Sequence, residues 1–221
     1  MTKNELSCLK KQKNNRKVGI MGGTFDPIHI GHLILAEQAY QQLDLDTILF
    51  MPSGNPPHKT ERRGRATDEQ RVDMVKLAIA DNLHFELSLA DMRKNEYSYT
   101  YHLLQQLNNE NPNTVYYFII GADSLFSFDT WMEPAKICKE CILAVATRDQ
   151  ASISEIREKI NDLEHKYNGR FVLLDTPDIE ISSHNLRNAA AQQQSIRYFV
   201  PDSVEEYIRD HNLYMSGIQT L

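Results

Sequence analysis

The sequence contains little cysteine and no long hydrophobic run. Three cysteines in 221 residues cannot form a complete set of disulfides, so the chain is not a disulfide-stabilised secreted domain. No apolar stretch approaches the roughly 20 residues of a membrane-spanning helix, and the N-terminal residues lack the apolar segment of a signal peptide. We therefore expect a cytoplasmic protein that does not bind a membrane.

An excess of positive charge is also missing. The chain has 24 lysines and arginines against 30 aspartates and glutamates, a net charge of -6. Residues 1–17 alone carry +5, so the remaining residues carry -11. Such an acidic body excludes a general nucleic-acid binder, whose affinity depends on neutralising many backbone phosphates. We expect residues 1–16 to be a disordered basic tail and residues 17–221 to form one domain, and the sequence leaves a homo-oligomer open.

The close cysteine pair, Cys138 and Cys141, has no second ligand pair of the kind that structural zinc sites need. A strand-like apolar run, Ile142–Ala146, follows it directly. The pattern favours buried thiols over a metal or redox site, and we assign no metal ligand in the chain.

Short apolar runs alternate with amphipathic segments along the chain. The runs predicted as strands are residues 17–21, 46–51, 85–89, 115–120, 141–146 and 171–174. The predicted helices are residues 33–43, 68–80, 99–109 and 153–167, followed by a helical end at 182–213. This alternation indicates an α/β fold with a mainly parallel sheet, covered by helices on both faces, that binds ligands at the carboxyl ends of its strands.

Two helix starts and one long loop stand out between these elements. Thr67 and Gln70 have the spacing of a capping box, and we expect Asp202 or Ser203 to cap the last helix. Residues 53–66 form a long loop that we expect to be mobile and able to close over a ligand.

The most informative segment is Gly22–His32, with the sequence GGTFDPIHIGH, between the first predicted strand and the first predicted helix. Paired glycines let the backbone turn sharply and bring its N–H groups close to a ligand, just before a helix N-terminus that favours anions. His29 and His32 are three residues apart, so both could donate hydrogen bonds to phosphate oxygens. The alternative is a simple turn whose histidines cap the helix.

GGTFDPIHIGH resembles the HxGH signature of the nucleotidyltransferase superfamily, and its long form is similar to that of bacterial nicotinate-nucleotide adenylyltransferases. Further segments resemble this family in the same order between residues 17 and 214. They are residues 55–59 (NPPHK), 98–100 (SYT), 120–124 (IGADS), Trp131, 181–183 (ISS) with Arg187, and 195–198 (SIRY) before 200–201 (VP). Two positions depart from the family pattern, because His184 replaces a usual Thr or Ser and Leu186 replaces a usual Ile.

The resemblance implies a Rossmann-like, doubly wound domain with a small helical C-terminal part. It also implies transfer of AMP from ATP to nicotinate mononucleotide, with release of pyrophosphate, in NAD biosynthesis, and with Mg²⁺ accompanying ATP. The second pKa of an acceptor phosphate is near ~6, so the group is mostly ionised at neutral pH and needs no general base. The enzyme has to align the reacting groups and stabilise the charge that moves onto pyrophosphate.

The resemblance assigns residues to both substrates. His29, His32 and Arg187 are expected to be catalytic, by stabilising phosphate charge. The expected ATP-binding residues are Gly22, Gly23, Thr24, Phe25, Ser182 and Ser183. The expected nicotinate mononucleotide-binding residues are Lys59, Thr100, Asp123, Trp131 and Arg148.

Simpler roles stay open for several of these residues. Ser182 and Asp123 could be helix caps, Lys59 a solvated loop lysine, and Trp131 a core residue. Two further functions are alternatives. The acceptor could be nicotinamide mononucleotide or another phosphate ester, or the chain could be a nucleotide-sensing relative without turnover, which the substitution at His184 and the basic tail would suit.

Overall fold

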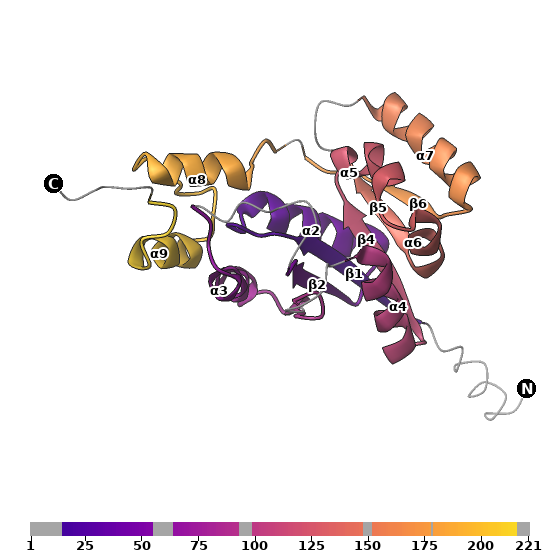
Figure 1. Ribbon diagram of the computed structural model, residues 1–221, viewed down its shortest axis with the longest axis horizontal. Helices are drawn as coiled ribbons and strands as arrows, with labels where there is room; N and C mark the ends of the chain where they lie inside the picture. Colours follow the sequence, from indigo (N-terminus) through magenta and orange to yellow (C-terminus); the bar gives the residue numbers. More distant parts are fainter. Residues whose placement is uncertain (1–14, 55–63, 93–98, 148–151, 178, 216–221) are drawn as a thin grey trace, which may run out of the picture.

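The computed structural model describes residues 15–54, 64–92, 99–147, 152–177 and 179–215 (Figure 1). Its centre is a sheet of six parallel strands in the order β3-β2-β1-β4-β5-β6. The strands are β1 (Arg16–Gly23), β2 (Thr47–Pro52), β3 (Phe85–Leu87), β4 (Thr114–Ile120), β5 (Ile142–Ala146) and β6 (Phe171–Leu174). All six strands were predicted, and their ends differ from the predicted ends by at most two residues.

The chain enters the sheet in the middle and winds outward in both directions. From β1 it runs through β2 to β3 on one side, and then returns to β4, β5 and β6 on the other side. The direction of winding therefore changes between β1 and β4. In a doubly wound sheet this switch point leaves a crevice at the carboxyl ends of the two strands, and ligands bind there.

Helices connect the strands and close the chain. The longer ones are α2 (Ile30–Leu43), α3 (Asp68–Ile79), α4 (Thr100–Glu110), α7 (Ile153–Tyr167), α8 (Ser183–Ala191) and α9 (Asp202–Asp210). Three short segments were not predicted, namely α5 (Ala122–Phe126), η1 (Phe128–Thr130) and α6 (Pro134–Glu140). Segments of this length contain two turns at most, so no hydrophobic period can be recognised in them.

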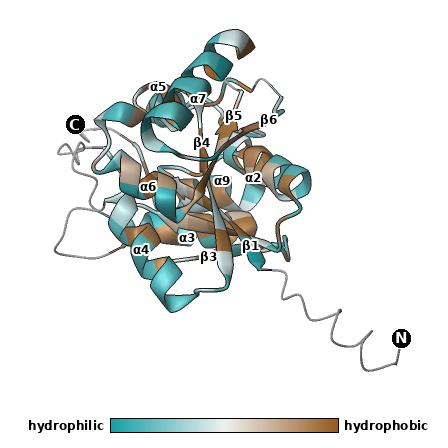
Figure 2. Cartoon of the chain, turned by 90° about the vertical axis from the view of Figure 1, so that its right-hand side faces the viewer, coloured by the Kyte–Doolittle hydropathy of each residue, from teal (hydrophilic) through white to brown (hydrophobic). Residues whose placement is uncertain are grey.

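Two buried clusters cover the two faces of the sheet. Helices α2, α3, α8 and α9 pack on one face together with Ile119 of β4, whereas α4, α5, α6 and α7 pack on the other face with Phe118 and Ile120. Neighbouring residues of β4 therefore point to opposite faces, as in any strand that is buried on both sides. Figure 2 shows the hydrophobic colours concentrated on the strands and hydrophilic colours on the outer turns of α7.

The start of α3 confirms the predicted capping box, since the Thr67 hydroxyl accepts a hydrogen bond from the Gln70 N–H and the Thr67 N–H donates one to the Gln70 side chain. At α9 the prediction is wrong. Asp202 and Ser203 are the first two residues of the helix, and Pro201 precedes them without a side-chain cap. The fixed φ of proline suits a helix start, so no capping hydroxyl is required. The Ser203 hydroxyl instead donates a hydrogen bond to the Leu77 carbonyl (3.4 Å).

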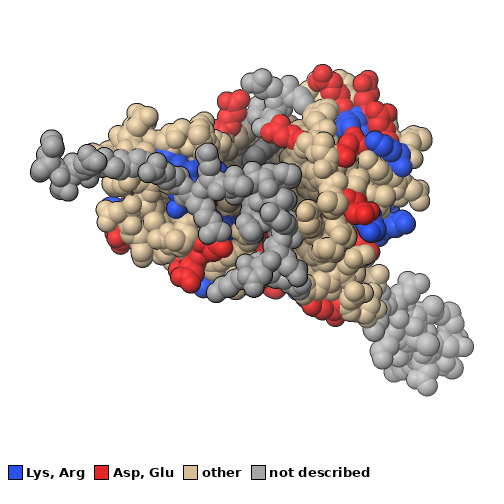
Figure 3. All heavy atoms as spheres, in the orientation of Figure 1, with Lys and Arg blue, Asp and Glu red and all other residues tan. Residues whose placement is uncertain are grey.

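The helical end predicted at 182–213 is two helices, α8 and α9, which are separated by residues 192–201. Gln193 and Tyr198 have positive φ angles of 57° and 68° in this connection, which a helix does not allow. Among the helices of the described residues, none is long and apolar enough to cross a membrane. Figure 3 shows Asp and Glu side chains at several places on the visible face, in keeping with the acidic composition of the chain.

Two predicted segments fall mainly outside the described residues. Of the basic tail, only residues 15 and 16 are described, and β1 begins at Arg16. Of the long loop, residues 55–63 lie outside the description, so the expected mobility of residues 53–66 stays a prediction.

Candidate active site

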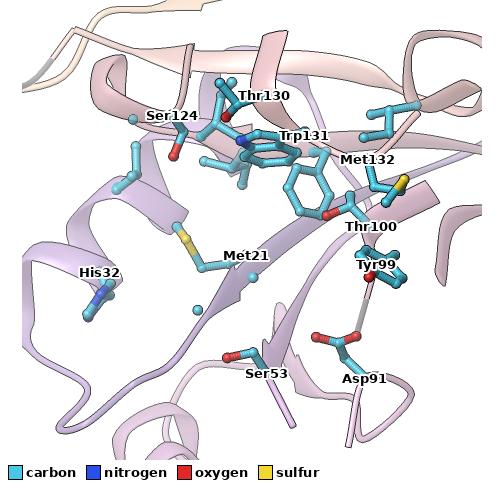
Figure 4. A pocket seen from close by; sticks show the side chains of 18 residues that line it. Met21, His32, Ser53, Asp91, Tyr99, Thr100, Ser124, Thr130, Trp131 and Met132 are labelled. Atoms are coloured by element: carbon cyan, nitrogen blue, oxygen red, sulfur yellow. The ribbon is translucent and has the colours of Figure 1, made fainter. Parts of the chain in front are cut away.

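A cavity of about 640 Å³ opens at the switch point of the sheet. Its floor is formed by residues 21–23 at the carboxyl end of β1 and residues 119–121 at the carboxyl end of β4. Figure 4 shows His32 at one end of the cavity, and Trp131 and Thr100 at the other end. A volume of this size lies within the range of about 300–1,000 Å³ that is usual for small-molecule sites.

Gly22 and Gly23 are the last two residues of β1 and pair with β2, so the sharp turn expected at these glycines is wrong. Gly23 is instead required for packing. A Cβ atom on Gly23 would lie 3.0 Å from the Phe25 ring, which is tighter than most real contacts. Phe25 is 1% exposed and has a positive φ of 50°, so its side chain turns beneath the loop and into the core. Gly22 and Gly23 line the cavity, whereas Thr24 and Phe25 do not, and the ring of Phe25 packs against Gly23. The expectation that this segment contacts a ligand through its main chain stays a prediction.

His29 and His32 form one unit at the N-terminus of α2. The His29 N–H donates a hydrogen bond to His32 Nδ1 (3.2 Å), and the two rings stack with their centroids 3.6 Å apart. Because Nδ1 of His32 accepts a hydrogen bond, the neutral ring carries its proton on Nε2 and offers a donor there. His29 is 2% exposed, whereas His32 lines the cavity. The capping role and a position at the cavity are therefore compatible.

Gly31 allows the two rings to lie this close to the helix. A Cβ atom at Gly31 would be 3.1 Å from Nδ1 of His29, so any other residue would push that ring away. The glycine of the HxGH pattern is thus favoured because it leaves room for the His29 ring.

A buried arginine that the sequence analysis missed, Arg71 on α3, ties this loop to the next one. Its guanidinium donates hydrogen bonds to the carbonyl oxygens of Thr24 (2.6 Å) and Ser53 (2.7 Å) and to the carboxylate of Asp68 (2.9 Å). Arg71 is 4% exposed. A signal existed in the sequence, because Arg71 lies three and four residues before the buried Met74 and Val75 on the same helical face.

Arg187 on α8 contacts the same loop from the other side, through Asp26. Its Nη1 donates a hydrogen bond to the Asp26 carbonyl oxygen (2.6 Å) and lies 3.9 Å from the carboxylate. The Tyr214 hydroxyl and the Ala66 N–H both donate to Oδ1 of Asp26, at 2.8 and 3.2 Å. Burial, followed by the negative charge of Asp26, raises the pKa of Tyr214, so this hydroxyl stays protonated and donates.

The residues around Arg187 in α8 have separate contacts. Ser182 caps the helix by accepting a hydrogen bond from the Asn185 N–H (3.2 Å), and the Ser183 hydroxyl donates to the Pro27 carbonyl (2.9 Å). His184, which departs from the family pattern, is exposed and lies 3.1 Å from the side-chain amide of Asn188. None of Ser182, Ser183 and Arg187 lines the cavity, so α8 buttresses the loop rather than the cavity wall.

The opposite end of the cavity is aromatic. Trp131 lies partly buried against Phe118 and Phe128, with ring centroids 6.2 and 5.4 Å away, and its remaining surface lines the cavity. Thr100, the first residue of α4, lines the same cavity. The structure thus brings His32, Thr100 and Trp131 to one cavity, although they are up to 99 residues apart in the sequence.

The other three residues expected at the acceptor end have different outcomes, since only Asp123 is among the described residues. Asp123 is exposed in the first turn of α5 and does not line the cavity, whereas its neighbour Ser124 does. Gly121, not Asp123, is the N-cap of α5. Lys59 and Arg148 lie outside the described residues.

Several residues that line the cavity were missed. They are Ser53, Asp91, Tyr99, Ser124, Thr130 and Met132. Tyr99 could have been found, because it stands next to Thr100 in the motif at residues 98–100. Asp91 could not, because it reaches the cavity through a close approach of two loops. At this approach the Gly54 N–H donates a hydrogen bond to the Asp91 carbonyl (3.1 Å), and a Cβ atom on Gly54 would lie 2.7 Å from that oxygen.

Within the described ranges, no group of three or more His, Cys, Asp or Glu side chains could hold a metal ion. Cys138 and Cys141 are buried free thiols, as predicted. Burial raises the pKa of Cys138 to about 11 and raises that of Cys141 further, so both stay protonated at neutral pH.

The chain resembles known proteins along most of its length. Residues 20–189 match the family model described as cytidylyltransferase-like. A Lachnoclostridium phytofermentans protein named "Probable nicotinate-nucleotide adenylyltransferase" is 42% identical over 200 residues, which cover 90% of this chain and 100% of that protein. A Clostridium novyi protein of the same name is 38% identical over 200 residues, which cover 90% and 99% of the two chains.

Solved structures share the fold. Plasmodium falciparum nicotinic acid mononucleotide adenylyltransferase matches with TM-scores of 0.75 and 0.73 in its complexes with NaAD and with APC. Each match covers 92% of this chain and 100% of the other chain, at 21% identity. The predicted Rossmann-like, doubly wound fold is therefore confirmed.

Proposed function

Because this chain belongs to the nicotinate-nucleotide adenylyltransferase family, we propose that it transfers the adenylyl group of ATP to nicotinate mononucleotide in NAD biosynthesis. An oxygen of the acceptor phosphate bonds to the α-phosphorus of ATP, the bond from that phosphorus to the β-phosphate oxygen breaks, and pyrophosphate leaves. The products are nicotinate adenine dinucleotide and pyrophosphate. The single observation that carries this proposal is the shared cavity, with the phosphate loop and His32 at one end and Trp131 and Thr100 at the other.

In this proposal the acceptor phosphate is its own nucleophile. Its second ionisation occurs near ~pH 6, so it is mostly a dianion at neutral pH and no side chain has to remove a proton. The protein has to hold two anionic substrates in line and stabilise the charge that develops on pyrophosphate. His32 suits this task, because it lines the cavity and its neutral ring carries a donor on Nε2.

The ATP end is assigned as follows. His32 donates its Nε2–H to a phosphate oxygen, and His29 and Arg187 complete the catalytic group. For His29 and Arg187, the support is their contact with His32 and with Asp26 of the loop. The residues proposed to bind ATP are Gly22, Gly23, Thr24 and Phe25, through main-chain atoms, together with Ser182 and Ser183.

Trp131 is proposed to stack on the pyridine ring of the acceptor, and Thr100 to hydrogen-bond its carboxylate. Both line the cavity opposite His32. Lys59, Asp123 and Arg148 stay proposed acceptor residues on the family resemblance alone.

Adenylyl transfer from ATP generally uses a divalent metal ion, and we propose Mg²⁺. Mg²⁺ is commonly held by substrate phosphates, water and one or two carboxylates rather than by an all-protein cage. Asp91 lines the cavity and is a carboxylate that could take part in this way. When bound with ATP, the ion would help to neutralise phosphate charge. A cytoplasmic location remains the prediction from the sequence.

Product formation tests the proposal. The purified chain is incubated with ATP and Mg²⁺ and with nicotinate mononucleotide, nicotinamide mononucleotide or phosphopantetheine, and dinucleotide products and pyrophosphate are separated by chromatography. We expect nicotinate adenine dinucleotide as the main product. Faster turnover of another acceptor would overturn the substrate assignment, and binding of ATP without any product would support a nucleotide-sensing relative instead.

A further inference from the structure

The acceptor end of the cavity is fastened to helix α7 by one carboxylate. Asp129 of η1 stands two residues before Trp131, and its Oδ2 accepts a hydrogen bond from Lys159 Nζ (2.5 Å). Its Oδ1 accepts from Lys166 Nζ (2.6 Å) and from the Tyr167 hydroxyl (2.8 Å). The two lysines are seven residues apart on α7 and therefore share one face of the helix. Asp129 thus has three donors from a single element.

The link from Asp129 to Trp131 is short and stiff. The Thr130 N–H donates to the Ser127 carbonyl (2.9 Å) and the Trp131 N–H donates to the Phe128 carbonyl (3.0 Å), which closes the turn of η1. Phe128 is fully buried, and its ring lies 5.4 Å from that of Trp131. A shift of the Asp129 backbone would therefore also shift the indole of Trp131.

We propose that Asp129 is a positioning residue for acceptor binding, which fixes Trp131 against helix α7 through its contacts with Lys159, Lys166 and Tyr167. This inference rests on the proposed function, in which Trp131 stacks on the pyridine ring. Ring stacking depends on the offset and tilt of the two planes, so a small displacement of the indole weakens it. The ion pairs belong to α7 and η1, and neither lysine lines the cavity.

A long-range electrostatic role would have the opposite sign. Asp129→Asn removes one negative charge and leaves two lysines beside the acceptor end, which would attract an anionic acceptor more strongly. If Asp129 positions Trp131, the same substitution weakens acceptor binding. The direction of the change in KM therefore separates the two mechanisms.

The test combines kinetics with the fluorescence of Trp131, which is the only tryptophan of the chain. For Asp129→Asn we expect the KM for nicotinate mononucleotide to rise about three- to tenfold, in line with the modest strength of partly exposed ion pairs. The KM for ATP and the value of kcat should change less than about twofold. Acrylamide should quench the tryptophan emission more strongly, because a less firmly held indole is more accessible.

One control variant and two further test variants complete the experiment. Asp162→Asn removes an exposed carboxylate from α7, the helix that carries Lys159 and Lys166, and should leave both KM values and the quenching unchanged. Lys159→Met should have a larger effect than Lys166→Met, because the Lys159 side chain is 22% exposed and that of Lys166 is 58% exposed. These lysine variants also keep the inference testable if Asp129→Asn does not fold.

The outcomes are distinct. An unchanged or lower KM for nicotinate mononucleotide in folded Asp129→Asn overturns the inference, as does unchanged quenching. If the wild-type chain does not use nicotinate mononucleotide at all, the proposed function fails. The quenching comparison then still decides whether Asp129 positions Trp131.

Discussion

The two ends of the cavity are held in place by different means. At the phosphate end, two arginines with little exposure donate to main-chain carbonyl oxygens of the loops after β1 and β2. Arg71 donates to Thr24 and Ser53, and Arg187 donates to Asp26. At the acceptor end, aromatic packing and ion pairs with side chains that are 22–58% exposed support Trp131. Solvent screens the partly exposed ion pairs at the acceptor end much more than the buried arginine hydrogen bonds at the phosphate end.

This difference has a chemical meaning under the proposed function. In-line transfer requires the α-phosphate and the two oxygens to be aligned within a fraction of an ångström, so the loop that holds phosphate has to be rigid. A displaced indole weakens stacking but leaves the reacting atoms of ATP in line, so the acceptor wall can rest on weaker, partly exposed contacts. We therefore expect changes at the phosphate end to affect turnover or folding, and changes at the acceptor end to affect acceptor affinity.

The largest expected effect is at His32. His32→Ala should lower kcat by about two to three orders of magnitude, because it removes a donor aimed at the transition state, with a much smaller loss of ATP affinity. Steady-state kinetics and equilibrium ATP binding measure the two effects. His32→Asn keeps a side-chain acceptor for the His29 N–H and should be nearly as slow, whereas His165→Ala on α7 should behave as wild type. Equal small losses in kcat and ATP binding for His32→Ala would contradict the catalytic role.

Arg71 comes second, with an effect on stability. Arg71→Met removes three charge-assisted hydrogen bonds inside a buried site and should lower the free energy of unfolding by about 3 kcal/mol. Urea denaturation measures this change. Lys76→Met, an exposed change on the same helix, is the matched control. If both variants are equally stable, Arg71 does not hold the loops together.

Tyr214 should have an intermediate effect. Tyr214→Phe keeps the ring but leaves the buried Asp26 carboxylate without one of its donors, which should cost about 1–2 kcal/mol of unfolding free energy. A lower kcat is expected as well, because Arg187 and the loop both depend on the position of Asp26. Tyr207→Phe removes a partly buried hydroxyl that donates to Asp73 instead of Asp26, and it serves as the control. A stability loss without any change in kcat would separate Asp26 from catalysis.

The smallest expected effect is the pH dependence of the acceptor end. Hydrogen bonds from Lys159, Lys166 and Tyr167 hold the pKa of Asp129 well below its usual range. A depressed folded pKa gives stability that is fully present above the unfolded pKa, about 4, and is lost as the pH falls through the folded pKa. The difference in unfolding free energy between wild type and Asp129→Asn should therefore be about 1 kcal/mol or less at neutral pH and shrink in acid. Denaturation at a series of pH values measures it, and a constant difference would argue against the ion pairs.

Local patterns were enough for much of the fold. The strands were predicted because each is a short apolar run between helical patterns, and the helix at 153–167 because it is a long amphipathic run with a clear period. The short helices between 122 and 140 were not predicted, because packing on a sheet that the chain completes later stabilises them. The cap at Asp202 was wrong for a related reason, since a proline can start a helix without a capping side chain.

The sequence by itself located the phosphate loop, because the paired glycines and the two histidines three residues apart stand between a strand and a helix. It did not determine the backbone there, since both glycines are part of β1. It also marked Trp131 and Thr100 through the family resemblance. Only the tertiary structure decided that these residues meet His32 in one cavity, that Arg71 and Tyr214 support the loop, and that Asp123 lies outside the cavity. The physical reason is that such contacts join residues up to 188 positions apart, and a local period or motif does not indicate which distant residues come into contact.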